Sequence, residues 1–197
     1  MLTLFHKPAT RSMSVVWLLE ELGVPFEIKE VTVRTMDGTG AIDPANPHPH
    51  GKVPALEHDG KRVFELAAIM LYLTDLFPEK KLGPQIGDPL RGEYLSWLAY
   101  RAGVIEPSIM MRRLNVQHMQ GAMGWAAADE VEEVLNDTLS MRPYILGEEF
   151  TAADISVGGV IAFLARVKML NETETLRAYT QRITSRPAFI KVMGPHS

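Results

Sequence analysis

One proline constrains this chain more than any other residue. Pro54 lies in the run Val53-Pro-Ala-Leu56, which reads as a short strand. A proline cannot donate a hydrogen bond to a neighbouring strand, so it must stand at a strand start or a sheet edge. X-Pro bonds adopt the cis form at low cost, typically in tight turns. A cis bond here would turn the backbone N–H and C=O of Val53 outward, where a peptide-like ligand could pair with them.

The residues after Pro54 predict a hairpin followed by a helix. Asp59-Gly60 is a turn signal, and Arg62-Val63-Phe64 reads as the returning strand. A helix over 66–76 begins directly after Glu65. The first N–H groups of a helix lack partners within it and attract carboxylates. The segment therefore predicts a small ligand that is peptide-like and carries a carboxylate.

The N-terminal third predicts a small α/β domain. A strand over 2–5 precedes a helix that has Ser12 as its candidate N-cap and Gly23 at its end. A second strand over 26–33 then predicts a parallel pair joined by a right-handed crossover. The loop over 34–51 is rich in Gly, Pro and Asp and separates this unit from the hairpin.

The rest of the chain predicts helices only. Prolines and glycines over 78–88 mark a linker between a domain over 1–77 and an all-helical domain over 89–197. Expected helices cover 90–114, with a kink between Gly103 and Pro107, then 126–139, 155–165 and 174–185, the last stopped by Arg186-Pro187. Thr151 and Asp154 form a capping-box pattern at the start of the apolar third helix, and we expect both to be structural.

Composition narrows the class of protein. The net charge of -4 gives no reason to expect nucleic acid or an anionic membrane as a partner. The chain has no cysteine, which excludes disulfides and thiolate sites. His48 and His50 flank a proline without acidic partners at ligand spacing, so we expect no metal site. The N-terminus resembles no signal peptide and no run is long enough to span a membrane, which favours a cytoplasmic protein.

Five sequence segments together resemble the soluble, bacterial-type glutathione S-transferase superfamily. They are Val16 to Glu27, Gly51 to Leu56, Glu65 to Leu73, Phe150 to Asp154 and Arg186 to Phe189. The resemblance implies a thioredoxin-like N-terminal domain followed by a helical bundle, usually paired as a homodimer. It implies glutathione as co-substrate, no metal, and attack of the glutathione thiolate on a small hydrophobic electrophile. Such detoxification extends in the family to peroxidase activity on organic hydroperoxides.

The thiolate-stabilising group is the least complete part of the resemblance. The family uses a tyrosine, serine or cysteine near the end of the first strand, but Phe5 and His6 occupy the tyrosine position here. Ser12, at the helix start, is the first candidate, and Thr10 is the second. Arg11 would add positive charge beside the sulfur. The alternative for Ser12 is a plain N-cap with no part in catalysis.

The glutathione-binding residues follow from the matched motifs. The resemblance implies that Val53 pairs its backbone with the cysteinyl part and that Pro54 holds the geometry. Glu65 would accept the γ-glutamyl ammonium, and Lys52, helped by His50, would pair with the glycyl carboxylate.

Leu66 departs from the family pattern. The family commonly has a serine or threonine there, whose hydroxyl binds the γ-glutamyl carboxylate. Leucine keeps only the backbone N–H, and a hydrogen bond to a charged group is worth roughly 1.5–3 kcal/mol. The loss favours weaker glutathione binding and keeps a second function open: a non-catalytic, transferase-like binding or regulatory module. Another thiol or peptide as ligand is a further alternative.

The electrophile pocket is expected between the two domains, lined by the first loop and the first long helix of the second domain. Its candidate residues are Met13, Tyr100, Ile105, Glu106, Met110, Arg113 and Trp125.

Overall fold

The computed structural model describes residues 1–194, and the chain divides into two compact units. The first combines Met1–Lys80 with the C-terminal segment that begins at Pro187, and the second spans Lys81–Arg186. The sequence had assigned all of 89–197 to the helical domain. The difference is a short helix, α8 (Pro187–Met193), where the sequence predicted only a helix end. Its Phe189 ring packs edge-on against Trp17 of the first unit, with ring centroids 4.9 Å apart.

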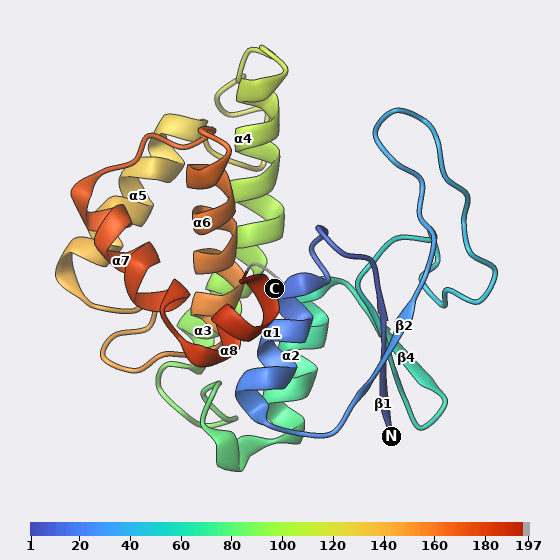
Figure 1. The fold of residues 1–197 in the computed structure, drawn as a ribbon. Helices are drawn as coiled ribbons and strands as arrows, with labels where there is room; N and C mark the ends of the chain where they lie inside the picture. Colours follow the sequence, from blue (N-terminus) through green and yellow to red (C-terminus); the bar gives the residue numbers. More distant parts are fainter. Residues whose placement is uncertain (195–197) are drawn as a thin grey trace. The chain divides into compact units, whose positions relative to one another are not determined.

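A four-stranded mixed sheet forms the centre of the first unit. Its strand order is β2-β1-β3-β4; β1 pairs with β2 in parallel and with β3 antiparallel, and β3 and β4 form a hairpin. The helices α1 and α2 lie together on one side of the sheet (Figure 1). The bounds are β1 Leu2–His6, α1 Met13–Leu22, β2 Glu27–Glu30, β3 Ala55–His58, β4 Lys61–Phe64, α2 Leu66–Leu76 and the short 3-10 helix η1 Pro78–Lys80.

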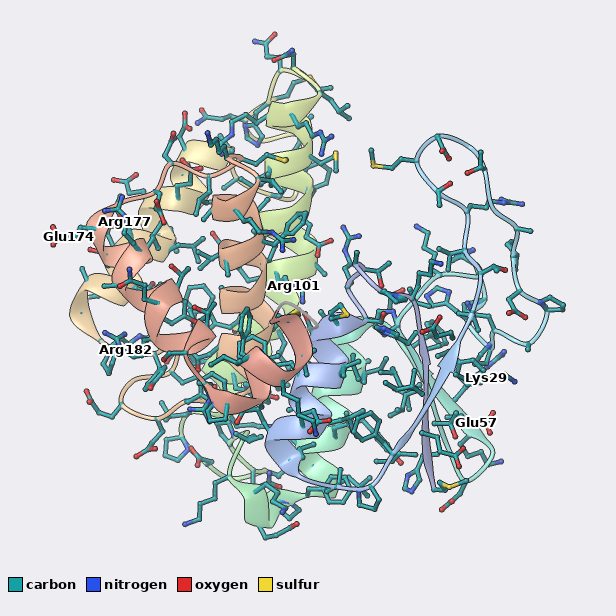
Figure 2. All side chains as sticks on the ribbon, in the orientation of Figure 1. Lys29, Glu57, Arg101, Glu174, Arg177 and Arg182 are labelled. Carbon is teal, nitrogen blue, oxygen red and sulfur yellow. The ribbon has the colours of Figure 1, made fainter. Side chains whose placement is uncertain are left out.

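Alternation along β1 builds the core of this unit. Leu4 and its cross-strand neighbour Leu56 are both fully buried, on the side that the helices cover. Because side chains alternate along a strand, Phe5 and Ala55 point to the other side, where they form a smaller cluster with Val31. Lys29, labelled in Figure 2, lies over the Phe5 ring at 5.4 Å.

Several predicted boundaries of the first unit hold and others shift. The helix over 66–76 is observed, and Gly23 ends α1 in the left-handed conformation at φ 63°. The second strand is shorter than the predicted 26–33, and all four of its residues are exposed. The third strand begins at Ala55, so Pro54 lies just before it. Ser12 occupies the N-cap position of α1, but its side chain makes no capping hydrogen bond.

The second unit is helical throughout its regular elements. The predicted interruption near Gly103 is a π-helical turn, η2, between α3 and α4. A second π-helical turn, η3, opens the apolar helix after Thr151. The bounds are α3 Arg91–Tyr100, η2 Arg101–Ile105, α4 Glu106–Arg113, α5 Ala128–Met141, η3 Asp154–Gly158, α6 Gly159–Arg166 and α7 Glu174–Thr184.

Asp154 holds the start of η3 as a fully buried carboxylate. Its Oδ2 accepts from the backbone N–H of Thr151 at 2.9 Å, while Thr151 Oγ1 accepts from the N–H of Ala153 at 3.2 Å. Its Oδ1 accepts from the N–H of Ile145 at 2.8 Å. Burial raises the pKa of Asp154, and these donors oppose the rise. Asp154 thus caps the helix and also fixes a loop nine residues earlier.

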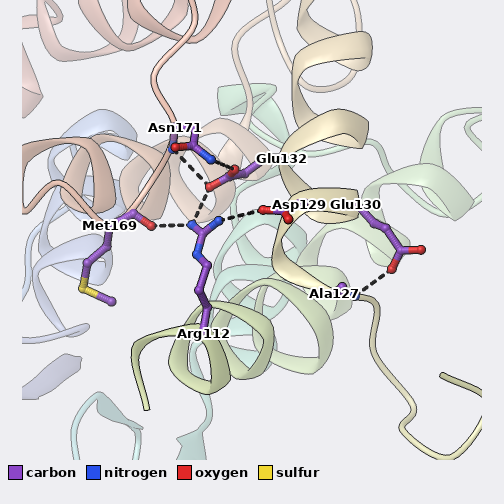
Figure 3. Close-up of polar contacts among 7 residues, drawn as sticks. All are labelled: Arg112, Ala127, Asp129, Glu130, Glu132, Met169 and Asn171. Carbon is purple, nitrogen blue, oxygen red and sulfur yellow. Dashed lines mark hydrogen bonds and ion pairs between the residues drawn. The ribbon is translucent and has the colours of Figure 1, made fainter. Parts of the chain in front are cut away.

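A polar network around Arg112 joins α4, α5 and the segment between α6 and α7 (Figure 3). Its guanidinium bonds to Glu132 at 2.5 Å, to Asp129 at 3.1 Å and to the carbonyl of Met169 at 2.7 Å. Glu132 is 8% exposed and also accepts from the backbone and side-chain N–H groups of Asn171. Burial works to raise the pKa of Glu132, but these hydrogen bonds outweigh it and hold the pKa below its ordinary value.

Candidate functional site

Three segments of the first unit meet at one end of its sheet. The register pairs Ala55 with Phe5 on one side and with Phe64 on the other. The loop after β1, the residues before β3 and the start of α2 therefore lie next to one another. This end of the sheet carries every residue that the sequence analysis assigned to glutathione binding.

Short polar contacts shape the loop that leads to Pro54. The Asn46 side chain donates to the carbonyl of Lys52 at 3.0 Å and accepts from the N–H of His48 at 3.0 Å. Gly51 adopts φ +59°, and a Cβ there would come within 2.5 Å of the Ile42 side chain. Only glycine fits this position without strain. The loop leads into a cis Val53–Pro54 bond.

Glu65 stands at the start of α2 in a backbone conformation that side chains rarely adopt. Its φ is 69° and its ψ is 128°, and its side chain is 69% exposed. A non-glycine residue at positive φ marks stored strain, which collects at ligand sites. Leu66 follows as the first helical residue and is 9% exposed. The carboxylate therefore faces solvent beside the N-terminus of α2.

His48 backs Glu65 from inside the protein. Its Nε2 lies 3.8 Å from Oε1 of Glu65, and its Nδ1 accepts the backbone N–H of His50 at 3.1 Å. Because Nδ1 accepts, the neutral ring carries its proton on Nε2, toward Glu65. Burial lowers the pKa of His48, against the opposing charge of Glu65; His50 and Lys52 lower it further. His50 and Lys52 themselves are exposed.

The loop after β1 contains a buried cluster of polar side chains. Ser12 is fully buried and His6 is 5% exposed, whereas Thr10 is half-buried. Ser12 Oγ lies 2.8 Å from His6 Nδ1 and 2.7 Å from Thr10 Oγ1. Thr10 Oγ1 lies 2.6 Å from the carbonyl of Lys7. Arg11, between the two hydroxyls, is exposed.

The residues expected around an electrophile fall on two separate parts of the fold. Met13 is half-buried in α1, whereas all the others except Trp125 lie in α3, η2 and α4 of the second unit. Ile105 is fully buried, while Met110 is 42% exposed. Trp125, in the segment before α5, donates to the sulfur of Met111 at 3.2 Å.

Three of those residues lie beside charged groups or have a shifted pKa. Glu106 lies 3.3 Å from Nε of the buried Arg101, which Figure 2 labels, and is only 23% exposed. Arg113 lines an open cavity of about 390 Å³ with Ile109, Arg112 and Lys168. For Tyr100, at the end of α3, burial raises the pKa of the phenol.

Sequence reasoning missed three residues of this site. His6 was noted only as the replacement of a tyrosine, and His48 was weighed only as a metal ligand. Asn46 was not considered, although the asparagine of an Asn-Pro pair commonly accepts a hydrogen bond from the backbone two residues further on, as Asn46 does from His48. The signal for His6 lies in the alternation of β1, which places it on the same buried side as Leu4.

The described residues contain neither a metal-binding group nor a membrane-spanning helix. Within 1–194, no group of three or more histidine, aspartate or glutamate side chains is arranged to hold a metal ion. No helix in the same range has the length and apolar character needed to cross a membrane.

Comparison with known proteins gives consistent matches. The family described as glutathione S-transferase, N-terminal domain, matches residues 1–75. Glutathione S-transferase GstA from Escherichia coli O157:H7 is 28% identical over 187 residues, covering 93% of each chain. A glutathione transferase structure from Methylococcus capsulatus superposes with a TM-score of 0.79 at 27% identity, covering 98% of this chain and 97% of that one. A sphingomonad glutathione S-transferase solved in complex with glutathione gives 0.78 at 27% identity, with 97% and 96% covered.

Proposed function

Because this chain belongs to the glutathione S-transferase superfamily and is a transferase enzyme, we propose that it conjugates glutathione to a small hydrophobic electrophile. The proposal includes reduction of organic hydroperoxides and a cytoplasmic homodimer. The observation that carries it is the group of ligand-binding features at one end of the sheet: the loop before Pro54, the strained Glu65 and the N-terminus of α2.

Each part of glutathione has a matching group at this end of the sheet. The backbone of Val53 lies outside the paired residues of β3 and can pair with the cysteinyl amide. The exposed carboxylate of Glu65 suits the γ-glutamyl ammonium, and the first N–H groups of α2 suit the carboxylate beside it. Lys52 is exposed and suits the glycyl carboxylate.

The thiolate requires a donor, and the loop after β1 is the source we propose. A free thiol has a pKa of about 8.5, so ionisation near neutral pH needs roughly 1.4 kcal/mol of stabilisation for each unit of depression. The hydroxyls of Thr10 and Ser12, the positive charge of Arg11 and the N-terminus of α1 all lie in this loop. The chain supplies no cysteine that could take their place.

For the second substrate we propose contacts from Tyr100, Glu106, Met110 and Arg113 of the second unit. Methionine and tyrosine offer adaptable apolar surface to a hydrophobic molecule. Ile105 would then support these side chains from the core, because it is fully buried.

Calorimetric titration with reduced glutathione and with an S-alkyl glutathione tests the proposal. Saturable binding to the parent protein is expected, and Glu65→Gln should weaken it about ten-fold or more, because a charge-assisted bond is lost. Glu79→Gln, which changes an exposed acid in η1, is the matched control. Absence of heat with either ligand up to millimolar concentration, at two temperatures, would overturn the assignment.

One observation favours a second candidate function, a binding or regulatory module without catalysis. The hydroxyl of Ser12 is fully buried, and Leu66 lacks the hydroxyl that would bind the ligand carboxylate. Turnover of a chlorinated aromatic substrate with glutathione separates the two functions. A protein that binds glutathione but shows no turnover above the uncatalysed rate would be the module.

A further inference from the structure

The polar cluster after β1 is a chain of three side chains that runs from the interior to the surface. His6 lies at its buried end, Ser12 in the middle and Thr10 at the half-buried end. Successive distances are 2.8 Å from His6 Nδ1 to Ser12 Oγ and 2.7 Å from Ser12 Oγ to Thr10 Oγ1. Both are within the range of strong hydrogen bonds.

The neighbouring backbone groups favour one direction for these hydrogen bonds. The Thr10 hydroxyl donates to the carbonyl of Lys7 at 2.6 Å, which uses its only proton. The Ser12 hydroxyl has two acceptors in reach, the carbonyl of Lys7 at 3.1 Å and Thr10 Oγ1 at 2.7 Å, and the shorter distance favours Thr10 Oγ1. That leaves Ser12 Oγ as an acceptor, and it receives the N–H of Lys7 at 3.2 Å. With the Ser12 proton directed to Thr10, the remaining partner, His6 Nδ1, is the donor, and the ring then carries its proton on Nδ1.

We propose that Thr10 is the residue that donates to the glutathione thiolate, and that Ser12 and His6 are positioning residues behind it. The proposal rests on the proposed glutathione transferase function and decides between its two candidate hydroxyls. On binding, the Thr10 proton turns from the carbonyl of Lys7 to the sulfur, and the thiol proton leaves to water. No bond of the protein breaks, and His6 and Ser12 keep their protons.

Burial separates the roles of the two hydroxyls. Ser12 has no exposed surface from which to reach a ligand, whereas Thr10 has some. A hydroxyl that accepts one hydrogen bond donates more strongly through its own proton, because neighbouring bonds polarise each other. His6 supplies a donor without carrying charge, which suits a ring whose pKa burial lowers, with only Glu30 opposing.

The proton position on His6 is the first test, and it needs no ligand. Nitrogen chemical shifts of the imidazole in the labelled protein distinguish the two neutral forms. A proton on Nδ1 is the expected result. A proton on Nε2 would overturn the proposed series of hydrogen bonds. His6 Nδ1 could then only accept the Ser12 proton, which would no longer be available to Thr10.

The second test measures the pKa of bound glutathione from thiolate absorbance across pH, with the dissociation constant measured in parallel. Thr10→Val should raise the bound thiol pKa by about one unit or more, and Thr10→Ser should restore most of the depression. Ser12→Ala and His6→Phe should each give a smaller rise, and His6→Asn, which keeps a donor near Nδ1, should recover part of it. Ser14→Ala, a neighbouring serine outside the chain of bonds, is the control.

The outcomes distinguish a failure of the proposed role of Thr10 from a failure of the transferase function on which it rests. An unchanged thiol pKa in Thr10→Val, with binding intact, would overturn the role of Thr10 and leave the transferase assignment standing. If the thiol pKa rises by about one unit in Ser12→Ala and not at all in Thr10→Val, Ser12 would be the residue that donates to the sulfur. No binding of glutathione to the parent protein would overturn both proposals. Thr10 is only half-buried, so its variants should fold. They therefore test the proposal even if the variants at the buried Ser12 and His6 do not fold.

Discussion

The phenol of Tyr179 donates a hydrogen bond of 2.9 Å to Oδ1 of Asp154, and both side chains are buried inside the second unit. Burial and the neighbouring carboxylate hold the pKa of Tyr179 well above its ordinary value, so the phenol stays a donor. The bond ties α7 to the beginning of η3. It extends the role of Asp154 beyond the helix cap that the sequence predicted.

Asp154→Ala should lower the free energy of unfolding by at least about 3 kcal/mol. The substitution leaves the N–H groups of Ile145 and Thr151 and the Tyr179 hydroxyl without their acceptor, at about 1–3 kcal/mol each. Chemical denaturation measures the change. Asp137→Ala, an exposed acid of α5, should stay within about 0.5 kcal/mol of the parent. Equal midpoints for the Asp154 variant and the parent would contradict the account.

Arg112→Ala should destabilise the second unit by roughly 3–5 kcal/mol, because it leaves the buried Glu132 without its cation. Thermal unfolding of this variant is compared with that of Arg113→Ala, which changes an exposed arginine next to it on the same helix. The hydrogen bonds from Asn171 to Glu132 would remain in the variant. A loss no larger than that of Arg113→Ala would show that those bonds suffice.

Leu66→Ser should tighten glutathione binding and weaken the fold together. The new hydroxyl at the start of α2 adds a bond to a charged carboxylate, which corresponds to about a ten-fold gain in affinity. Loss of a leucine that is 9% exposed should cost about 1.5–3 kcal/mol of stability. Calorimetry gives the first quantity and denaturation the second. Unchanged affinity would mean that the γ-glutamyl carboxylate does not lie at this helix start.

Glu65→Gly should have the opposite pair of effects. Glycine adopts the φ of 69° found here without strain, so relief should stabilise the fold by about 1 kcal/mol or more. The same change removes the carboxylate proposed to hold the ligand ammonium, so affinity should fall at least ten-fold. Glu65→Ala removes the carboxylate without relieving the backbone and serves as the matched control. A glycine variant no more stable than the alanine variant would argue against strain.

Stability should fall as the pH drops below about 6.5. Burial lowers the pKa of both His6 and His48 from an ordinary value of 6.5. The unfolded chain therefore takes up protons at a higher pH than the native protein, and their contribution is complete only above pH 6.5. Urea midpoints at pH 7.5 and 5.5 measure the slope. Replacing both histidines with asparagine should flatten it, and an equal slope in the double variant would assign it to other groups.

The sequence predicted elements whose signals are local. Gly23 and Pro25 bound α1, and the helix over 66–76 follows from its apolar composition. α8 was missed because Arg186-Pro187 reads as a stop, whereas proline is equally at home in the first turn of a new helix.

The parts of the site that depend on contacts between distant residues could not be read from the chain. The burial of Ser12 depends on where β1 places His6, six residues away, and no spacing rule carries that information. The two π-helical turns are similar: Gly103 suggested an interruption, but not its kind. His48 and Glu65 are far apart in the sequence, and only the fold brings their side chains within 3.8 Å of each other.

The π-helical turn η2 sets the rotational phase between two helices. An α-helix advances by about 100° per residue, so a turn that holds one extra residue reorients every side chain after it. Removing one residue from 101–105 would restore ordinary helical bonding and rotate α4 by about 100° relative to α3. Arg112 would then face away from Glu132, and the network that joins α5 to the segment around Asn171 would have no centre. The number of residues in η2 therefore determines the rotation of α4 about its axis relative to α3.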